Sequence, residues 1–222
     1  MARLKVAVLI SGRGSNMGAL IDACAVPDFP AEIVLVVSNR ADAAGLETAK
    51  AAGVPTALIG HRDYPDRASF EAALNAALDA AGVELVCLAG FMRLLTADFV
   101  RRWHDRLINI HPSLLPAFKG LHTHEQVLSA GVRITGCTVH FVRAEMDDGP
   151  IIVQAAVPVL PDDDAERLAA RVLRVEHQCY PLALRLIAEG RVRVENERVI
   201  LDASGDGLAS LVNPAAGIRA AK

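Results

Sequence analysis

The chain has 222 residues, of which 52% are hydrophobic and 4% aromatic, and its formal net charge is −3. This length suits one domain with a substantial core, and the slightly acidic balance argues against a nucleic-acid partner held by a broad basic surface. The four cysteines lie far apart, without CxxC or metal-ligand spacing, and no apolar run is long enough for a signal peptide or a membrane span. We therefore expect a cytoplasmic protein with no membrane partner, in which most of the cysteines are small core residues.

Strand-like and helix-like segments alternate through the first half of the chain. Continuous apolar runs predict buried strands at residues 5–10, 32–37, 54–59, 84–88 and 107–111. The segments between them predict helices at 17–25, 42–52, 66–81 and 96–105, with N-terminal caps at Ser15 or Asn16, at Asp66 and at Thr96. Repeated strand–helix units favour a parallel sheet, and ligands bind such sheets beyond the carboxyl ends of the strands.

The second half of the chain has a different pattern. Strand-like runs at 133–143 and 151–160 flank an acidic turn at 144–150, which predicts an antiparallel pair that brings a carboxylate over the cleft. We also expect a short helix at 122–130, a long helix from a capping box of Asp163 and Glu166 to about residue 189 with a kink at Pro181, and a hairpin at 191–201.

The predicted fold is therefore α/β, with a single Rossmann-like, open, mostly parallel sheet, helices on both of its faces and an antiparallel C-terminal part. We expect one domain over residues 1–201. The Gly-, Ala- and Ser-rich residues 202–222 are expected to form a loose tail.

A glycine-containing loop follows the first predicted strand. Residues 11–16 read SGRGSN, and a helical pattern begins directly after them. Free N–H groups and the helix dipole make this geometry a binding site for anions. The third glycine of a dinucleotide fingerprint is missing, because Met17 stands in its place, and Arg40 follows the second strand where an acidic residue would contact a ribose. A phosphate therefore fits better than NAD, although a tight turn that merely needs glycine explains the loop equally well.

Polar residues alternate with apolar ones in the strand at 107–111. Asn109 and His111 point to one side of this strand, whereas Ile108 and Ile110 point to the other, and Pro112 ends the ladder. Two donors fixed at a rigid strand end could stabilise an oxygen that gains negative charge during a reaction. The alternative is a core histidine and an edge asparagine that are hydrogen-bonded to neighbours.

Five motifs together identify a resemblance. They are residues 10–16 (ISGRGSN), 88–93 (LAGFMR), 109–116 (NIHPSLLP), 120–124 (GLHTH) and 147–151 (DDGPI). With them the chain resembles the folate-dependent formyltransferases over residues 5–189, and most closely the branch that acts on glycinamide ribonucleotide. NIHPSLLP and the D-x-G motif mark the superfamily, whereas SGxGSN with GLHTH is specific to that branch.

The resemblance implies a role for each matching position. Asn109, His111 and Asp147 match the catalytic trio. Gly14, Ser15 and Asn16 match the loop that holds the phosphate of the substrate. Glu176 matches a residue that contacts the ribose of the same substrate. The formylfolate site is matched by Arg67, Met92, Arg93, Leu94, Leu95 and Asn109. Without the resemblance, Arg67 would be interpreted as a solvated helix residue, Glu176 as a surface charge and Met92 as part of the core.

The implied reaction transfers the formyl group of 10-formyltetrahydrofolate, a co-substrate, to the amine of 5'-phosphoribosylglycinamide in de novo purine biosynthesis. Asn109 and a protonated His111 would stabilise the oxyanion, and Asp147 would keep His111 charged and oriented. No metal is implied. The expected partners are these two small molecules, and the resemblance leaves open whether the protein is a monomer or a homodimer.

Two departures from the family pattern stand out: Asp148 occupies a position that is often small, and residues 117–119 differ but are not expected to be catalytic. The alternatives are a formyltetrahydrofolate deformylase, a methionyl-tRNA formyltransferase and a non-catalytic nucleotide-binding module. The first two are disfavoured because we expect no additional N-terminal or C-terminal domain. The third has no use for Asn109, His111 and Asp147 together.

Overall fold

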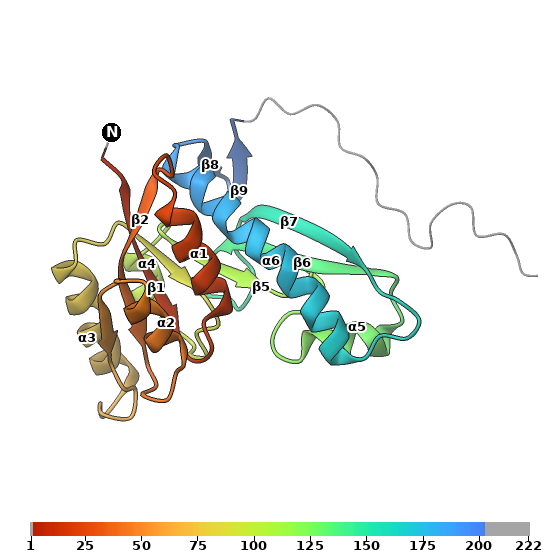
Figure 1. Ribbon diagram of the computed structural model, residues 1–222, viewed down its shortest axis with the longest axis horizontal. Coiled ribbons are helices and arrows are strands. Elements are labelled where there is room, and N and C mark those ends of the chain that lie inside the picture. The colour runs from red at the N-terminus through yellow and green to blue at the C-terminus, as the bar shows by residue number, and fades with distance from the viewer. Residues whose placement is uncertain (1, 203–222) are drawn as a thin grey trace, which may run out of the picture.

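The computed structural model describes residues 2–202, in which strands and helices alternate (Figure 1). The strands are β1 (Leu4–Ile10), β2 (Ala31–Ser38), β3 (Thr56–Leu58), β4 (Leu85–Leu88), β5 (Leu107–His111), β6 (Ile134–Phe141), β7 (Ile151–Pro158), β8 (Val192–Glu195) and β9 (Arg198–Leu201). The helices are α1 (Ser15–Ala25), α2 (Gly45–Ala51), α3 (Arg67–Ala80), α4 (Ala97–Arg102), α5 (Thr123–Ala130) and α6 (Ala165–Ala188).

Seven strands form one sheet in the order β3-β2-β1-β4-β5-β6-β7. The first five strands of this order pair in parallel, whereas β6 pairs with β5 and with β7 in antiparallel register. A separate antiparallel hairpin joins β8 and β9. The predicted fold class is confirmed, including the antiparallel pair in the second half of the chain.

The core has two layers, one on each face of the sheet. Val8 of β1 and Ile108 of β5 belong to a cluster that includes residues of α1 and α6, whereas Leu9 and Leu107 belong to a cluster with residues of α3 and α4. Successive residues of a strand point to opposite faces, so an apolar run buried on both sides needs helices on both sides. The same alternation puts Asn109 and His111 on the side of Leu107, as expected.

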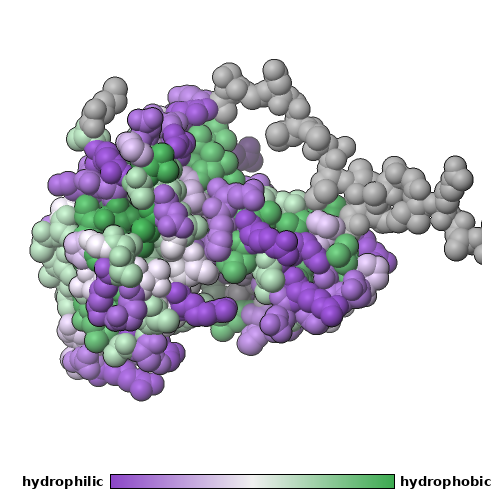
Figure 2. All heavy atoms as spheres, in the orientation of Figure 1, coloured by the Kyte–Doolittle hydropathy of each residue, from purple (hydrophilic) through white to green (hydrophobic). Residues whose placement is uncertain are grey.

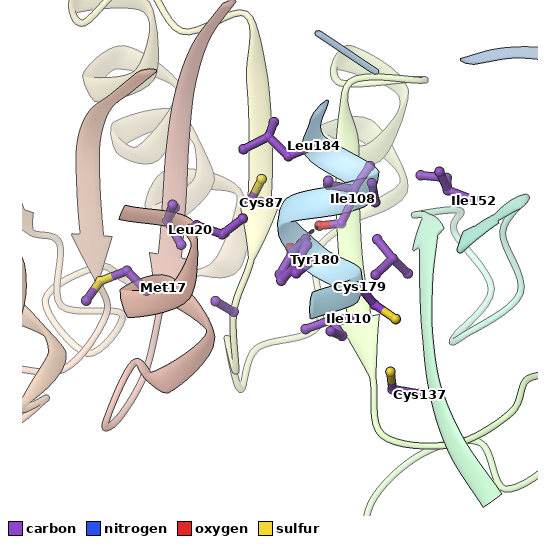
Figure 3. Packing of buried hydrophobic residues seen from close by; sticks show 14 of the residues in the cluster. Met17, Leu20, Cys87, Ile108, Ile110, Cys137, Ile152, Cys179, Tyr180 and Leu184 are labelled. Carbon is purple, nitrogen blue, oxygen red and sulfur yellow. Dashed lines mark hydrogen bonds between the residues drawn. The ribbon is translucent and has the colours of Figure 1, made fainter. Parts of the chain in front are cut away.

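Helix α6 anchors the sheet through a buried tyrosine (Figure 3). The Tyr180 hydroxyl donates to the carbonyl oxygens of Leu88 in β4, at 2.9 Å, and Ile108 in β5, at 3.2 Å. The helix runs through Pro181 to Ala188, close to the predicted end at about residue 189, and the kink at Pro181 stays a prediction. Hydrophilic residues cover the outer surface over α5 and the start of α6 (Figure 2), so the long helix is polar outside and apolar toward the sheet.

Two predicted caps are confirmed and two are wrong. Asp66 and Thr96 accept hydrogen bonds from the first turns of α3 and α4. Helix α1 has Gly14 as its N-cap instead of Ser15 or Asn16, and Gly14 has a left-handed φ of 71° that glycine adopts without strain. At α6 the cap is Asp164, because the Asp163 carboxylate is paired with Arg171 and the Leu160 N–H.

Several elements are shorter than predicted. Helix α2 begins at Gly45 and α4 ends at Arg102, while β3 has only three residues. The hairpin predicted at 191–201 is present as β8 and β9. Residues 203–222 of the predicted tail lie outside the described residues. Within residues 2–202 no helix is long and apolar enough to cross a membrane.

Candidate active site

The amide of Asn109 is held by a histidine on the neighbouring strand. His140 lies opposite Asn109 in the β5–β6 ladder, and its Nε2 is 3.3 Å from the Asn109 Nδ2. His140 Nδ1 is 2.9 Å from the Phe141 carbonyl oxygen, so Nδ1 carries the hydrogen and Nε2 accepts from Asn109. Burial lowers the pKa of His140, which favours this neutral form. Asn109 therefore uses one amide hydrogen on His140 and has a second to donate.

His111 lies between a carboxylate and a backbone carbonyl. Its Nδ1 is 3.5 Å from Asp147 Oδ2, and its Nε2 is 2.9 Å from the Phe118 carbonyl oxygen. The side chains of His111 and Asp147 are only 6% and 12% exposed. Both ring nitrogens face oxygen atoms that only accept, and an imidazole satisfies both when each nitrogen carries hydrogen. Asn109, His111 and Asp147 are therefore brought to one end of β5, as the sequence predicts.

The two adjacent aspartates of the turn point in different directions. Asp147 has a positive φ of 52°, and its Oδ2 also accepts a hydrogen bond from Gly120 N at 2.8 Å. The Asp148 side chain is 56% exposed and forms an ion pair with Lys119. Asp147 is thus the carboxylate beside His111, whereas Asp148 lies at the surface.

Phe118 contacts the site, although the sequence predicts no catalytic role for residues 117–119. Its backbone has a φ of 55°, and its carbonyl oxygen occupies the hydrogen-bonding direction of His111 Nε2. The Ser113 hydroxyl donates to the carbonyl oxygens of Ala117 at 2.6 Å and Phe118 at 3.2 Å, which ties this segment to the end of β5. The contact is made by backbone atoms, which a comparison of side chains does not reveal.

The glycine-containing loop meets α6 at the start of α1. Asn16 Nδ2 donates to Glu176 Oε2 at 2.7 Å, which joins two predicted substrate-binding residues 160 positions apart. Glu176 is 6% exposed, and its burial raises the pKa of its carboxyl group. The Oδ1 atom of Asn16 is buried and has no hydrogen-bond partner within residues 2–202. The N-terminal N–H groups of α1 are available to a polar ligand.

The predicted folate residues Met92–Leu95 form a loop between β4 and α4. Met92 and Leu94 are 66% and 63% exposed, so both residues are accessible to a ligand. Arg67 is the first residue of α3 and is exposed. Residue Glu71, one turn further along α3, accepts a hydrogen bond from Thr96 N at 2.7 Å and connects this helix to the loop.

Sequence reasoning missed His140 and Glu71. His140 alternates with apolar residues in its strand, but its position opposite Asn109 depends on the strand register, which no local pattern gives. Glu71 resembles an ordinary polar position of a helix until α4 is placed against it. Among residues 2–202, no group of three or more His, Cys, Asp or Glu side chains is arranged to hold a metal ion.

The structure combines a Rossmann-like sheet with a glycine-containing loop after β1. An amide, an imidazole and a carboxylate meet at the end of β5. This combination is typical of enzymes that transfer formyl groups. The chain belongs to the formyl transferase family, which matches residues 4–184.

It is 43% identical over 198 residues to phosphoribosylglycinamide formyltransferase from Haemophilus influenzae, covering 89% of this chain and 93% of that protein. It is 53% identical over 198 residues to the trifunctional purine biosynthetic protein adenosine-3 of Bos taurus, covering 89% of this chain but only 20% of the bovine protein. The crystal structure of glycinamide ribonucleotide transformylase 1 from Symbiobacterium toebii has 50% identity and a TM-score of 0.88, and the match covers 90% of this chain and 94% of that one.

Proposed function

We propose that this protein transfers the formyl group of 10-formyltetrahydrofolate to the amine of 5'-phosphoribosylglycinamide, giving formylglycinamide ribonucleotide and tetrahydrofolate, a step of de novo purine biosynthesis. The observation that carries the proposal is the meeting of Asn109, His111 and Asp147 at the end of β5. It is supported by membership of the formyl transferase family and by relatives named for this reaction.

The chemistry needs donors placed where negative charge develops. The amine nitrogen of the ribonucleotide attacks the formyl carbon, a C–N bond forms, and the carbonyl electron pair moves onto oxygen. The second hydrogen of the Asn109 amide and the Nε2–H of His111 would then bind this oxyanion. Removal of one such donor typically lowers the rate about 100- to 1,000-fold. His111 must exchange the Phe118 carbonyl for the substrate oxygen in order to donate.

Collapse of the intermediate completes the transfer. The bond between the formyl carbon and N10 of the folate breaks, and the proton lost by the attacking amine is delivered to N10 through His111 or water. Asp147 orients the imidazole through Nδ1 and provides a counter-charge when the ring is charged. No other group of the chain needs to change its covalent bonds.

The two substrates would bind at two loops that follow the neighbouring strands β1 and β4. The phosphate would bind the N–H groups at the start of α1, at Gly14, Ser15 and Asn16, and Glu176 would accept from a ribose hydroxyl. The folate would bind along Met92, Arg93, Leu94 and Leu95, with Arg67 free to pair with a carboxylate.

The test is an assay of the purified chain with 10-formyltetrahydrofolate, with and without 5'-phosphoribosylglycinamide. Equimolar tetrahydrofolate and formylated ribonucleotide, formed only when the amine is present, would support the proposal. Formyl loss at the same rate without the amine would instead identify a deformylase, with water as the acceptor. The cytoplasmic location, and the choice between monomer and homodimer, stay predictions that cell fractionation and light scattering can check.

A further inference from the structure

The loop at residues 89–96 carries four of the residues proposed to bind folate, yet it forms neither a helix nor a strand. Met92 and Leu94 are exposed, whereas Phe91 and Leu95 are partly buried against the apolar core. Two buried polar side chains from outside the loop, Ser11 and Glu71, add hydrogen bonds to its backbone at Met92 and Thr96.

Ser11 fixes the first end of the loop. Its hydroxyl accepts a hydrogen bond from Met92 N at 2.8 Å and donates to Asn39 Oδ1 at 2.6 Å. Asn39 is 4% exposed, and its Nδ2 lies 3.1 Å from His61 Nδ1. Because the serine proton points to Asn39, a lone pair of the hydroxyl oxygen remains directed at the Met92 N–H.

Glu71 fixes the second end. Glu71 is only 4% exposed. Both of its carboxylate oxygens accept hydrogen bonds from Thr96, one from the backbone N–H at 2.7 Å and the other from the hydroxyl. Thr96 is also the N-cap of α4. A buried carboxylate is stable only when it is hydrogen-bonded, so this contact holds α3 and the loop in one relative position.

The same contact places Arg67. Residues four apart on a helix lie on one face, so Arg67 and Glu71 are neighbours along α3. A helix held by Glu71 against Thr96 presents Arg67 at a fixed distance from the loop. The backbone of Met92 to Leu95 and the positively charged Arg67 side chain of α3 are therefore presented together.

We infer that Ser11 and Glu71 are positioning residues for the folate, which hold the loop at 89–96 and Arg67 in the geometry that binds the co-substrate. Neither residue is required to touch the reacting atoms. The inference rests on the proposed function, because it takes this loop as the formylfolate site. Ser11 begins the loop proposed to bind phosphate, but its hydroxyl positions the loop proposed to bind the folate.

The test compares Ser11→Ala, Glu71→Ala and Glu71→Gln in the full chain, with Glu47→Ala on the exposed face of α2 as the control. Calorimetry measures the Kd of tetrahydrofolate and of 5'-phosphoribosylglycinamide, and steady-state assays measure kcat and KM. We expect Ser11→Ala and Glu71→Ala to raise the Kd of tetrahydrofolate and the folate KM about 5- to 10-fold, as the loss of one or two hydrogen bonds allows. The ribonucleotide Kd and kcat should change less than twofold.

Glu71→Gln is the rescue variant. Its amide oxygen still accepts from Thr96 N, while its NH2 group can donate to the Thr96 hydroxyl, so the folate KM should stay within about threefold of the parent. If Glu71→Ala fails to fold, Ser11→Ala decides the question, since it removes a single oxygen atom. Unchanged folate affinity in Ser11→Ala, or equal losses for both ligands, would overturn the inference. A parent protein that binds no tetrahydrofolate would instead overturn the proposed function.

Discussion

At the scale of single residues, the ability of the site to bind an oxyanion depends on which donor hydrogens already form hydrogen bonds within the protein. Asn109 gives one hydrogen to His140 and has one to spare, whereas His111 has an oxygen atom in front of each nitrogen. The bond from His111 to the Phe118 carbonyl has to be broken before His111 can stabilise an oxyanion. The Phe118 segment and the substrate oxygen thus compete for the same hydrogen.

Replacement of His111 by asparagine tests whether this residue supplies catalysis. His111→Asn keeps a polar side chain but removes the Nε2 donor, so kcat should fall about 100- to 1,000-fold while Tm changes by no more than a few degrees. Steady-state assays and thermal unfolding measure the two quantities. The matched control is His104→Asn, since the His104 side chain is 51% exposed and lies beside its neighbour Asp105, with 3.4 Å between His104 Nδ1 and Asp105 Oδ2. A catalytic role would be excluded by near-normal turnover of the His111 variant.

The paired aspartates allow a comparison of two charges at adjacent positions. Asp147→Asn removes the charge beside His111 but retains the fold, because asparagine tolerates the left-handed φ of 52° and its oxygen still accepts from Gly120 N. Asp147 orients His111 and offsets its charge while the oxyanion is bound, so kcat/KM should fall about 100-fold, which corresponds to about 2.7 kcal/mol of transition-state stabilisation. Asp148→Asn loses only a surface pair with Lys119 and should change kcat/KM by less than about threefold, with an effect that fades at high salt.

Both variants are assayed at two ionic strengths. If Asp148→Asn were the more damaging of the two, the carboxylate that assists His111 would be Asp148 and the placement of this turn would be wrong.

The sequence allows the directions of these residues to be predicted, and the resemblance pairs His111 with Asp147, but their other partners could not be predicted. Strand alternation is a local property, so Asn109 and His111 could be put on one side of β5 from the sequence. The hydrogen bond from Asn109 to His140 needs the register of β5 against β6, and the contact of His111 with Phe118 needs the path of a loop. Neither follows from local residue preferences.

At the scale of elements, the loop between β1 and α1 is tightly packed against α2. Gly14 has a φ of 71°, and a Cβ atom there would lie 3.1 Å from Met17 Cε and 3.2 Å from the Cα of Gly45. Residue preferences predict the cap of α1 at Ser15 or Asn16, because serine and asparagine favour N-cap positions. Tertiary contacts prevail here, since Asn16 extends its amide to Glu176 on α6.

Gly14→Ala should weaken ribonucleotide binding more than folate binding. Its added methyl group meets backbone at Gly45, so the loop must shift and its N–H groups lose their alignment to a phosphate. We expect the Kd of 5'-phosphoribosylglycinamide to rise about tenfold or more, equivalent to about 1.4 kcal/mol, and that of tetrahydrofolate to stay within about twofold.

The control for backbone strain is Gly53→Ala. Gly53 has the same kind of φ, 73°, but a Cβ there meets nothing within 4 Å. This variant should lose about 1–2 kcal/mol of stability with normal binding. Equal weakening of both ligands in Gly14→Ala, measured by calorimetry, would indicate a general folding defect instead of a phosphate site.

At the scale of the whole molecule, α6 joins the two halves of the fold. Its Tyr180 hydroxyl bonds to β4 and β5, and its Glu176 carboxylate bonds to α1 across 160 residues. The sequence predicts the alternation of strands and helices, because buried parallel strands have a distinctive apolar pattern. The position of α6 against α1 could not be predicted, since it results from long-range packing. Without the family resemblance, Glu176 would be interpreted as a surface charge, whereas it is buried in the structure.

The buried Glu176 should therefore lower stability at neutral pH. Its raised pKa means that the folded protein binds this proton more tightly than the unfolded chain does. The folded state is thus relatively favoured at pH values below about 4.5, the ordinary pKa, and this advantage is lost as pH rises through the raised pKa. Above that range the cost of burying a carboxylate is fully present.

Glu176→Gln removes that cost and keeps an oxygen that accepts from Asn16. At pH 7 we expect Tm to rise by about 2–4 °C, as about 1 kcal/mol produces in a domain of this size, and the gain to vanish below about pH 4.5. The Kd of the ribonucleotide should rise about tenfold, because a neutral amide accepts more weakly than a carboxylate. Glu166→Gln, on the exposed first turn of α6, is the matched control and should give neither effect. Thermal unfolding from pH 4 to pH 8 and calorimetry check both expectations. A variant that is less stable at pH 7 would show that the surroundings of Glu176 stabilise its charge, contrary to the desolvation argument.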